Sequence, residues 1–408
     1  MQPFLTRVIL KNYKSIAGCD VRLPPLCFLV GRNGAGKSNF LDALRLVSDA
    51  LNTSLDHALR DRSGINEVRR RSAGHPTHFG IRLEFRLSDE TYGFYAFRVG
   101  SQKEGGFEVQ QEECRIYENK ALDENPVYYA IDCGTVIESS IPTPPAAKSD
   151  RLYLVNLSGF VEFRPLYDSL SRMGFYNLNP DVIRMEQPPD VGLVLKRDGS
   201  NLASVLDKLE ASAPGAKQKV EEFLSKVVPD IKGVTVRTVL SKEALEFRQS
   251  TQGSAEPWRF LAANMSDGTL RALGILVAIF QSAATKTNPP PLIGIEEPES
   301  ALHPAAAGAL RDALRTAAKR TQVLITSHSP DLLDDKSISV DSILSVVNDG
   351  GVTRIAGVDP ESRSAIRDGL YTAGELLRSD QLDADASQIK EQRAIQRELF
   401  AKTVENGP

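Results

Sequence analysis

The stretch Gly31–Ser38, GRNGAGKS, has the residue types and spacing of a loop that binds a phosphate chain, G-x-x-x-x-G-K-[ST]. Its glycines let the backbone curl so that successive N–H groups face the anion, and the helix that follows presents its positive end. In such a loop Lys37 reaches the β- and γ-phosphates, and the Ser38 hydroxyl binds Mg²⁺. The residues expected to line the nucleotide are Gly31, Asn33, Gly34, Gly36, Lys37, Ser38 and Asn39.

Two adjacent carboxylates end the apolar run Leu292–Glu297 (LIGIEE), which is typical of a buried strand. At the carboxyl end of a central strand such a pair lies beside the phosphate loop, where α/β sheets bind ligands. Glu296 would then hold Mg²⁺ through water, and Glu297 would orient or deprotonate the attacking water. The alternative interpretation is an acidic helix start, with Pro298 and Glu299 in its first turn.

Two further segments carry weaker individual signals. His328, in TSHSP, directly follows an apolar strand, so it is expected at a strand end where contact with a γ-phosphate is geometrically reasonable. Asn264–Arg271 (NMSDGTLR) precedes a helical pattern, and Ser266 or Asp267 suits the N-cap position. Taken alone, the histidine is more often structural and the serine more often only a cap.

The elements that must position these groups alternate between strands and helices. Strands are expected at 4–12, 20–30, several short ones within 78–135, 245–250, 292–295 and 323–325, and helices at 37–50, 200–228 with a break at 213–215, 266–280 and 301–319. This order predicts an α/β fold, with a parallel core sheet, an antiparallel β subdomain and a helical insertion. The expected domains are 1–50 and 261–360 for the two parts of the core, 51–150 for the antiparallel subdomain, 151–260 for a connecting helical segment and 361–408 for a helical tail.

Composition sets wider limits. The 408 residues carry a net charge of −4, which excludes a globally basic surface but leaves room for a local basic groove. Four cysteines without metal-binding spacing are expected to be reduced thiols of a cytosolic protein. The sequence shows neither a signal peptide nor a run of about 18 apolar residues, so we expect a cytoplasmic protein without a membrane partner.

Together and in this chain order, the segments resemble the ABC-type ATPase head of the RecF, SMC and OLD class, in a form without long coiled-coil arms. GRNGAGKS matches Walker A, SDGTL resembles the signature loop, LIGIEE matches Walker B, SALHP resembles the D-loop and TSHSP the switch-histidine loop. ILKNYKSI before Walker A, and the asparagine that extends it to GKSN, are similar to this branch. The resemblance covers about 4–50 and 155–380.

The resemblance implies ATP and Mg²⁺ as ligands and ATP hydrolysis as the activity. It gives Glu296 the Mg²⁺-side position, makes Glu297 the catalytic acid and lets His328 contact the γ-phosphate. Ser266 and Gly268 would reach the nucleotide of a second copy, which implies a homodimer with composite ATP sites.

The sequence departs from this pattern at several positions. Glu296 replaces the usual Asp, and Asp267 and Thr269 replace the usual Gly and Gln of the signature. Gln187 is the candidate for the glutamine that assists the metal.

Three functions compete at this point. One is a nucleotide-gated ATPase that acts on DNA in repair or phage defence, together with a separately encoded effector such as a nuclease. The cluster Arg69–Arg71 with Arg62 would contact DNA phosphates or ATP, or else form an ordinary charged turn. The others are the ATP-binding subunit of a transporter and a self-contained OLD-like nuclease, for which the roughly 80 residues after His328 are expected to be too few.

Overall fold

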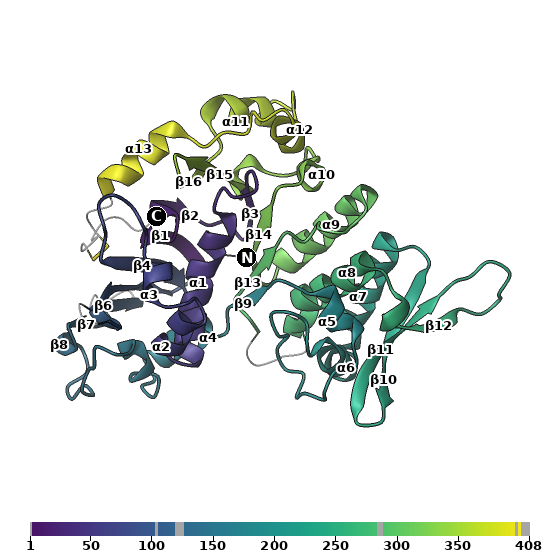
Figure 1. The fold of residues 1–408 in the computed structure, drawn as a ribbon, viewed down its shortest axis with the longest axis horizontal. Helices are drawn as coiled ribbons and strands as arrows, with labels where there is room; N and C mark the ends of the chain where they lie inside the picture. The colour runs from purple at the N-terminus through teal and green to yellow at the C-terminus, as the bar shows by residue number, and fades with distance from the viewer. Residues whose placement is uncertain (1, 103–104, 119–125, 284–288, 396–398, 401–408) are drawn as a thin grey trace.

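The computed structural model describes residues 2–102, 105–118, 126–283, 289–395 and 399–400. Within these ranges one 13-stranded mixed sheet runs through the molecule, and a 3-stranded sheet projects from a helical lobe (Figure 1). In spatial order the large sheet contains β8 (Thr135–Ser139), β7 (Val127–Asp132), β6 (Phe107–Glu118), β5 (Thr91–Ser101), β4 (His78–Arg86), β1 (Leu5–Tyr13), β2 (Ile16–Arg22), β16 (Val352–Gly357), β15 (Ile343–Asp349), β3 (Leu26–Val30), β14 (Gln322–Ser327), β13 (Leu292–Glu296) and β9 (Gly174–Tyr176).

The helices flank this sheet and build the helical lobe (Figure 1). They are α1 (Lys37–Asn52), α2 (Leu55–Arg60), α3 (Ile65–Val68), α4 (Arg164–Ser171), α5 (Pro180–Arg184), α6 (Leu202–Ser212), α7 (Pro214–Val227), α8 (Asp267–Phe280), α9 (Ala307–Ala318), α10 (Pro330–Leu333), α11 (Pro360–Arg367), α12 (Ala373–Arg378) and α13 (Ala386–Ile395). None of the described helices is long and apolar enough to cross a bilayer.

The strands β15, β3, β14, β13 and β9 run parallel and form the core that faces the site. Parallel strands of this kind are buried on both faces, which explains their nearly continuous apolar sequences. In β3, Cys27 and Leu29 belong to one hydrophobic cluster, whereas Phe28 and Val30 belong to the other. The phosphate loop therefore emerges from a strand that is fixed from both sides.

The structure confirms the predicted α/β class and the antiparallel strands of the β subdomain. The strand expected at 20–30 is two strands, because Pro24 and Pro25 interrupt the ladder between β2 and β3. The helix expected from residue 301 begins later, with a 3-10 turn at Pro304–Ala306 before α9. Residues 298–301 form turns, so the interpretation of Glu296 and Glu297 as an acidic helix start is wrong.

Candidate ATP site

The phosphate loop packs closely against the neighbouring strands. Gly34 and Gly36 have φ values of 77° and 103°, in the region that favours glycine. A Cβ at Gly36 would lie 2.0 Å from Thr353 Oγ1, and one at Gly31 would lie 2.0 Å from the carbonyl oxygen of Val346. Glycine is therefore required here both by backbone conformation and by the approach of β15 and β16.

Lys37 is the first residue of α1, and its side chain folds back over the loop. Its Nζ donates to the carbonyl oxygens of Gly31 at 2.8 Å and Arg32 at 3.0 Å. Burial lowers the pKa of Lys37, and the negative charges of Glu297 and Glu299 partly offset that effect. The two carboxylates thus act on the same ammonium group, although they lie far from it in sequence.

Asn39 supports the loop through a one-way chain of hydrogen bonds. Its Nδ2 donates to Ser15 Oγ at 2.7 Å. Ser15 Oγ lies 2.6 Å from Thr353 Oγ1, which donates to the carbonyl oxygen of Ala35 at 2.8 Å. The asparagine therefore ties the β1–β2 turn to the loop, which gives a physical reason for ILKNYKSI and GKSN to occur together. In this structure the Asn39 amide supports the loop through Ser15 of the β1–β2 turn.

The order of the parallel strands brings the predicted groups together. β14 lies between β3 and β13, with Ser327 paired to Val30 and Glu296 paired to Thr326. Because parallel strands end at the same edge, the phosphate loop, the acid pair and His328 follow three neighbouring strand ends. The structure therefore joins the three segments that the sequence singled out separately.

Glu297 stands at a backbone turn. Its φ is 43°, a conformation that costs about 1–3 kcal/mol for a residue other than glycine. The Glu297 N–H donates to the carbonyl oxygen of Thr326 at 3.0 Å, and its Oε1 lies 3.3 Å from His328 Nδ1. The turn aims the carboxylate at the histidine instead of continuing β13.

Glu299 fixes the histidine loop, residues 326–330, through two hydrogen bonds. Its Oε1 accepts hydrogen bonds from Ser327 Oγ at 2.6 Å and from the His328 N–H at 3.3 Å. Its Oε2 is buried and has no hydrogen-bond partner among the described residues. A buried carboxylate oxygen without a partner is unusual in a folded protein, and it marks a place for a ligand or water.

Two arginines approach the acid pair from other elements. Arg197 Nη2 donates to Glu296 Oε1 at 3.1 Å, and the carbonyl oxygen of Arg197 accepts from the N–H of Asn177, just after β9. Arg271 of α8 donates to the carbonyl oxygens of Glu296 at 3.3 Å and Glu297 at 3.4 Å. Burial lowers the pKa of Arg271, while the nearby carboxylates raise it.

The loop SDGTL begins α8 and lies against the loop that follows the acid pair. Ser266 caps the helix, because its Oγ accepts from the N–H of Thr269 at 3.2 Å. A Cβ at Gly268 would lie 2.4 Å from the carbonyl oxygen of Ala301, a residue with φ of 66°. Within one chain Ser266 therefore has the capping role; its contact with the nucleotide of a second copy stays a prediction.

The side chain of Gln187 bonds to the backbone at the start of α6. The side chain is buried, its Nε2 donates to the carbonyl oxygen of Gly199 at 2.8 Å, and its Oε1 accepts from the N–H of Ala203 at 2.9 Å. Its amide therefore fixes the start of α6. A role for Gln187 beside the metal would break both bonds, and the geometry gives that prediction no support.

The arginines of the predicted basic cluster serve local structure. Arg62 is buried and pairs with Asp42 at 3.0 Å and Asp49 at 2.9 Å. Arg70 donates to the carbonyl oxygen of Ser15 at 2.8 Å, beside the phosphate loop's supporting chain. Arg62 is therefore withdrawn from any ligand, whereas Arg71 is exposed and pairs with Glu67. A contact of Arg69–Arg71 with DNA or ATP stays a prediction.

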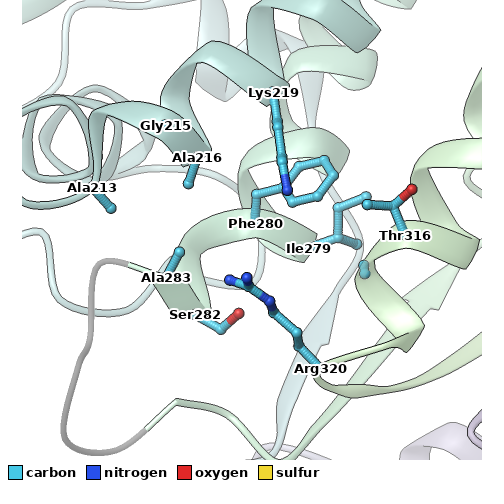
Figure 2. A pocket seen from close by; sticks show the side chains of 11 residues that line it. Ala213, Gly215, Ala216, Lys219, Ile279, Phe280, Ser282, Ala283, Thr316 and Arg320 are labelled. Atoms are coloured by element: carbon cyan, nitrogen blue, oxygen red, sulfur yellow. The ribbon is translucent and has the colours of Figure 1, made fainter. Parts of the chain in front are cut away.

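A cavity of about 360 Å³ lies where α7 begins and where α8 and α9 end (Figure 2). Lys219 and Arg320 reach toward it from opposite sides, with Ile279 and Phe280 between them in this view (Figure 2). Its lining contains none of the residues of the phosphate loop, acid pair or histidine loop. We assign it no part in ATP chemistry.

The residues at the strand edge fit ATP and Mg²⁺. No side chain caps the amino end of α1 and its first turn has no acidic residue, so its N–H groups suit a phosphate. Asn33 and Ser38 are exposed on the loop, where they are accessible to a ligand. Glu296 supplies a carboxylate oxygen, and Mg²⁺ prefers oxygen ligands with phosphates and waters completing its shell.

Three residues at this edge were not singled out from the sequence. Glu299 had a signal, the third acid in EEPE, but a helix start explained it equally well. Arg197 and Arg271 had none, because each reaches the acid pair only through the tertiary fold.

Comparison with known proteins gives one family match. The family model AAA_21, described as "AAA domain, putative AbiEii toxin, Type IV TA system", matches residues 26–124 and 195–334, more than half of the chain. The matched segments contain the phosphate loop, the acid pair and His328.

A curated relative and several solved structures are also similar. The Old nuclease of Escherichia phage P2 is 24% identical over 371 residues, covering 81% of this chain and 57% of that protein. This chain thus spans little more than half the length of that relative.

An SMC head bound to the C-winged helix domain of ScpA superposes with a TM-score of 0.56 at 16% identity, covering 88% of this chain and 99% of that one. The Smc head of Pyrococcus furiosus, with an extended coiled coil and bound to the C-terminal domain of ScpA, gives 0.51 at 12% identity, covering 90% and 100%. These likenesses show the fold of an SMC-type head. The longest described helix has 16 residues, so the described part carries no long coiled coil.

Proposed function

This chain belongs to the AAA_21 family, and from that premise we propose that it is an ATP-driven switch that binds Mg²⁺–ATP at the carboxyl edge of its core sheet, hydrolyses it and closes as a homodimer. It is an ATPase of the SMC and OLD class. The observation that supports hydrolysis is the convergence of Lys37, Glu297 and His328 from three separate parallel strand ends.

In the proposed reaction the protein positions ATP and water and accepts one proton. Glu297 takes a proton from a water whose oxygen attacks the γ-phosphorus, the bond to the bridging oxygen breaks and ADP leaves. Lys37 exchanges its two loop carbonyls for phosphate oxygens, and His328 donates to the γ-phosphate. Mg²⁺, held by Ser38 and Glu296, would neutralise phosphate charge when bound. Glu299 keeps the histidine loop in place through Ser327.

Phosphate release tests this function directly. Purified protein with ATP and Mg²⁺ is expected to release phosphate, and chelation of the metal should stop the release. A preparation that binds ATP in calorimetry but releases no phosphate, with or without DNA, would contradict the proposal.

Closure as a dimer is supported by the exposed position of Ser266 at the start of α8. Ser266→Arg and Lys37→Ala chains should each be inactive alone, whereas their mixture should regain part of the activity. In a mixed dimer one composite site keeps both an intact Lys37 and an intact Ser266. The matched control mixes Ser266→Arg with the double variant that carries both changes, which leaves no intact site. Equal rates in the two mixtures would show that the site is complete within one chain.

We further propose that the switch acts on DNA, in repair or phage defence, and licenses a separately encoded nuclease. ATP-driven closure would give such an effector a surface that differs between nucleotide states. Purification at native expression, with the products of neighbouring genes, is expected to recover the effector with this chain.

A second candidate, an ATP-dependent nuclease in its own right, is favoured by the match to the Old nuclease across 81% of this chain. The two are separable by one assay. If the chain elutes alone with and without ATP, and alone cleaves DNA in an ATP-dependent way, the second candidate is correct and the separate effector is not.

A further inference from the structure

The small sheet has one face packed on helices and one face open to solvent. It consists of β10 (Ile231–Val239), β11 (Lys242–Gln249) and β12 (Trp258–Leu261), and it projects from the helical lobe (Figure 1). Val234 and Phe247, which pair across β10 and β11, are fully buried on the side of α6 and α7. Because side chains alternate along a strand, the residues between them form the outward face.

Three arginines share this outward face. Arg248 stands directly opposite Arg259 in the strand register, and Arg237 lies on the other neighbouring strand. Their side chains are 46%, 72% and 64% exposed, respectively. Like charges placed directly opposite each other destabilise a sheet. The arrangement is therefore unfavourable for folding alone, and it concentrates positive charge on a protein with a net charge of −4.

One buried carboxylate organises two of these arginines. Glu246 lies between them, 3.5 Å from Arg237 Nη1 and 3.4 Å from Arg259 Nη1. Arg248 Nη2 lies 3.9 Å from Glu221 Oε1 of α7. A guanidinium has five N–H donors, so each of these single contacts leaves most of its donors facing solvent. Glu246 thus orients the two arginines without neutralising the face.

The shape of the face selects an extended ligand over a small one. The hollow between Arg237 and Arg259 measures about 530 Å³, and Glu246 stands in its lining, where it repels a small anion that enters. Arg237 and Arg259 line this hollow from β10 and β12, the two outer strands of the small sheet, and Arg248 stands on β11 outside the lining. A row of guanidinium forks at the surface matches successive phosphates of a polyanion, because each fork pairs bidentately with phosphate oxygens.

We propose that the outward face of β10–β12 binds the phosphodiester backbone of DNA through Arg237, Arg248 and Arg259. The inference rests on the proposed action on DNA and gives it a surface. This face lies on the helical lobe, away from the core sheet (Figure 1). It is the side of the small sheet opposite α6 and α7. Contacts of this kind depend on charge and not on base sequence, so binding is expected to be sequence-independent and strongly weakened by salt.

The test is fluorescence anisotropy with labelled duplex and single-stranded DNA of equal length. The triple variant Arg237→Gln, Arg248→Gln, Arg259→Gln should bind at least about tenfold more weakly, and its salt dependence should fall by roughly two to three released ions. The matched control removes the same charge from exposed arginines elsewhere, by Arg60→Gln, Arg151→Gln and Arg164→Gln. The control should bind within about twofold of the wild type at the same salt. Circular dichroism melting checks that both variants are folded.

The remaining outcomes separate this surface from the proposed function. If the wild type binds DNA and the triple variant binds it equally well, the surface is wrong and the action on DNA stands. If the wild type binds neither DNA form with ATP, ADP or no nucleotide, the action on DNA itself is wrong. Polyglutamate serves as a probe for an acidic protein. If the triple variant binds DNA as the wild type does but no longer binds polyglutamate, the face fits an acidic protein and the inference is overturned.

Discussion

Glu112 in the antiparallel part of the sheet and Glu299 beside the phosphate loop both have carboxylate oxygens removed from water, but these oxygens are bonded differently. Glu112 is fully buried and accepts hydrogen bonds at both oxygens. Its donors are Tyr95 and Tyr129 through their hydroxyls and Tyr153 and Leu154 through their N–H groups. Glu299 accepts at Oε1 only, and its Oε2 has no partner among the described residues. A saturated carboxylate holds one fold in place, whereas a half-saturated one leaves capacity for a ligand.

The backbone differs less between the two regions. The strands β4 to β7 pair in antiparallel register with one irregularity between β5 and β6, but Cys133 in the β7–β8 turn is left-handed, with a φ of 42°. At the candidate site, Glu297 and Ala301 have φ values of 43° and 66° within one short loop. What distinguishes the candidate site is therefore that the strained Glu297 also carries a carboxylate that faces His328.

The largest expected effect separates a functional lysine from a structural one. Lys37→Ala should weaken ATP binding at least about a hundredfold, since charge-assisted hydrogen bonds contribute about 1.5–3 kcal/mol each. Lys217 is also buried, but it pairs with Glu221 at 2.9 Å within the helical lobe. Lys217→Ala should bind ATP normally in the same calorimetric titration. Undiminished binding by Lys37→Ala would refute the phosphate-loop assignment.

Glu112→Ala should mainly lower stability, whereas Glu299→Ala should mainly lower ATP turnover. Glu112→Ala leaves several buried donors without an acceptor, so the free energy of unfolding should fall by about 3 kcal/mol or more. Glu299→Ala leaves the Ser327 hydroxyl and the His328 N–H without this acceptor but also removes an unpaired buried oxygen, so the free energy of unfolding should fall by less, about 1–2 kcal/mol. Its ATP turnover should nevertheless fall about tenfold or more.

Urea unfolding and phosphate release measure the two effects separately. A large loss of stability in Glu299→Ala with unchanged turnover would reverse the contrast between the two carboxylates.

A smaller effect concerns pH. Burial lowers the pKa of Lys37, so the ammonium group loses its proton at a lower pH than an ordinary lysine does. The charge that attracts phosphate is fully present below that pKa and is lost as pH rises through it. ATP affinity should therefore decline by about a few-fold on the alkaline side before pH 10.5, the usual lysine value. Lys37→Arg, whose guanidinium stays charged, should show a flat profile over this range. A wild-type profile equally flat would contradict the assignment.

The parts of the site that could be predicted are those whose requirements lie in one continuous stretch. The phosphate loop needs its glycines, Lys37 and Ser38 within eight positions of a strand-to-helix turn, so the sequence alone identifies it. The acid pair and His328 were predictable because each follows an apolar strand, and parallel strands end at one edge. Their mutual geometry was not, because the position of β14 between β3 and β13 is a property of the sheet.

The parts that could not be predicted depend on tertiary packing. From the sequence, Glu299 resembled a residue in the first turn of a helix. In the structure, the left-handed backbone of Glu297 turns the chain, and no helix begins there. Arg62 resembled part of a basic patch, but Asp42 and Asp49 on α1 draw it into the core. Gln187 resembled a metal-side glutamine, and its amide is used by the start of α6.

The central claim is that Glu297 is the acid that turns ATP over at the strand edge. The most direct measurement compares ATP affinity with phosphate release in Glu297→Gln, beside Glu296→Gln and the wild type. Glu297→Gln should bind ATP normally, release phosphate about 10²–10⁴-fold more slowly and accumulate as an ATP-bound dimer. If Glu297→Gln keeps near wild-type turnover while Glu296→Gln alone stops it with Mg²⁺ binding intact, the roles of the two carboxylates are reversed and the account of the site is wrong.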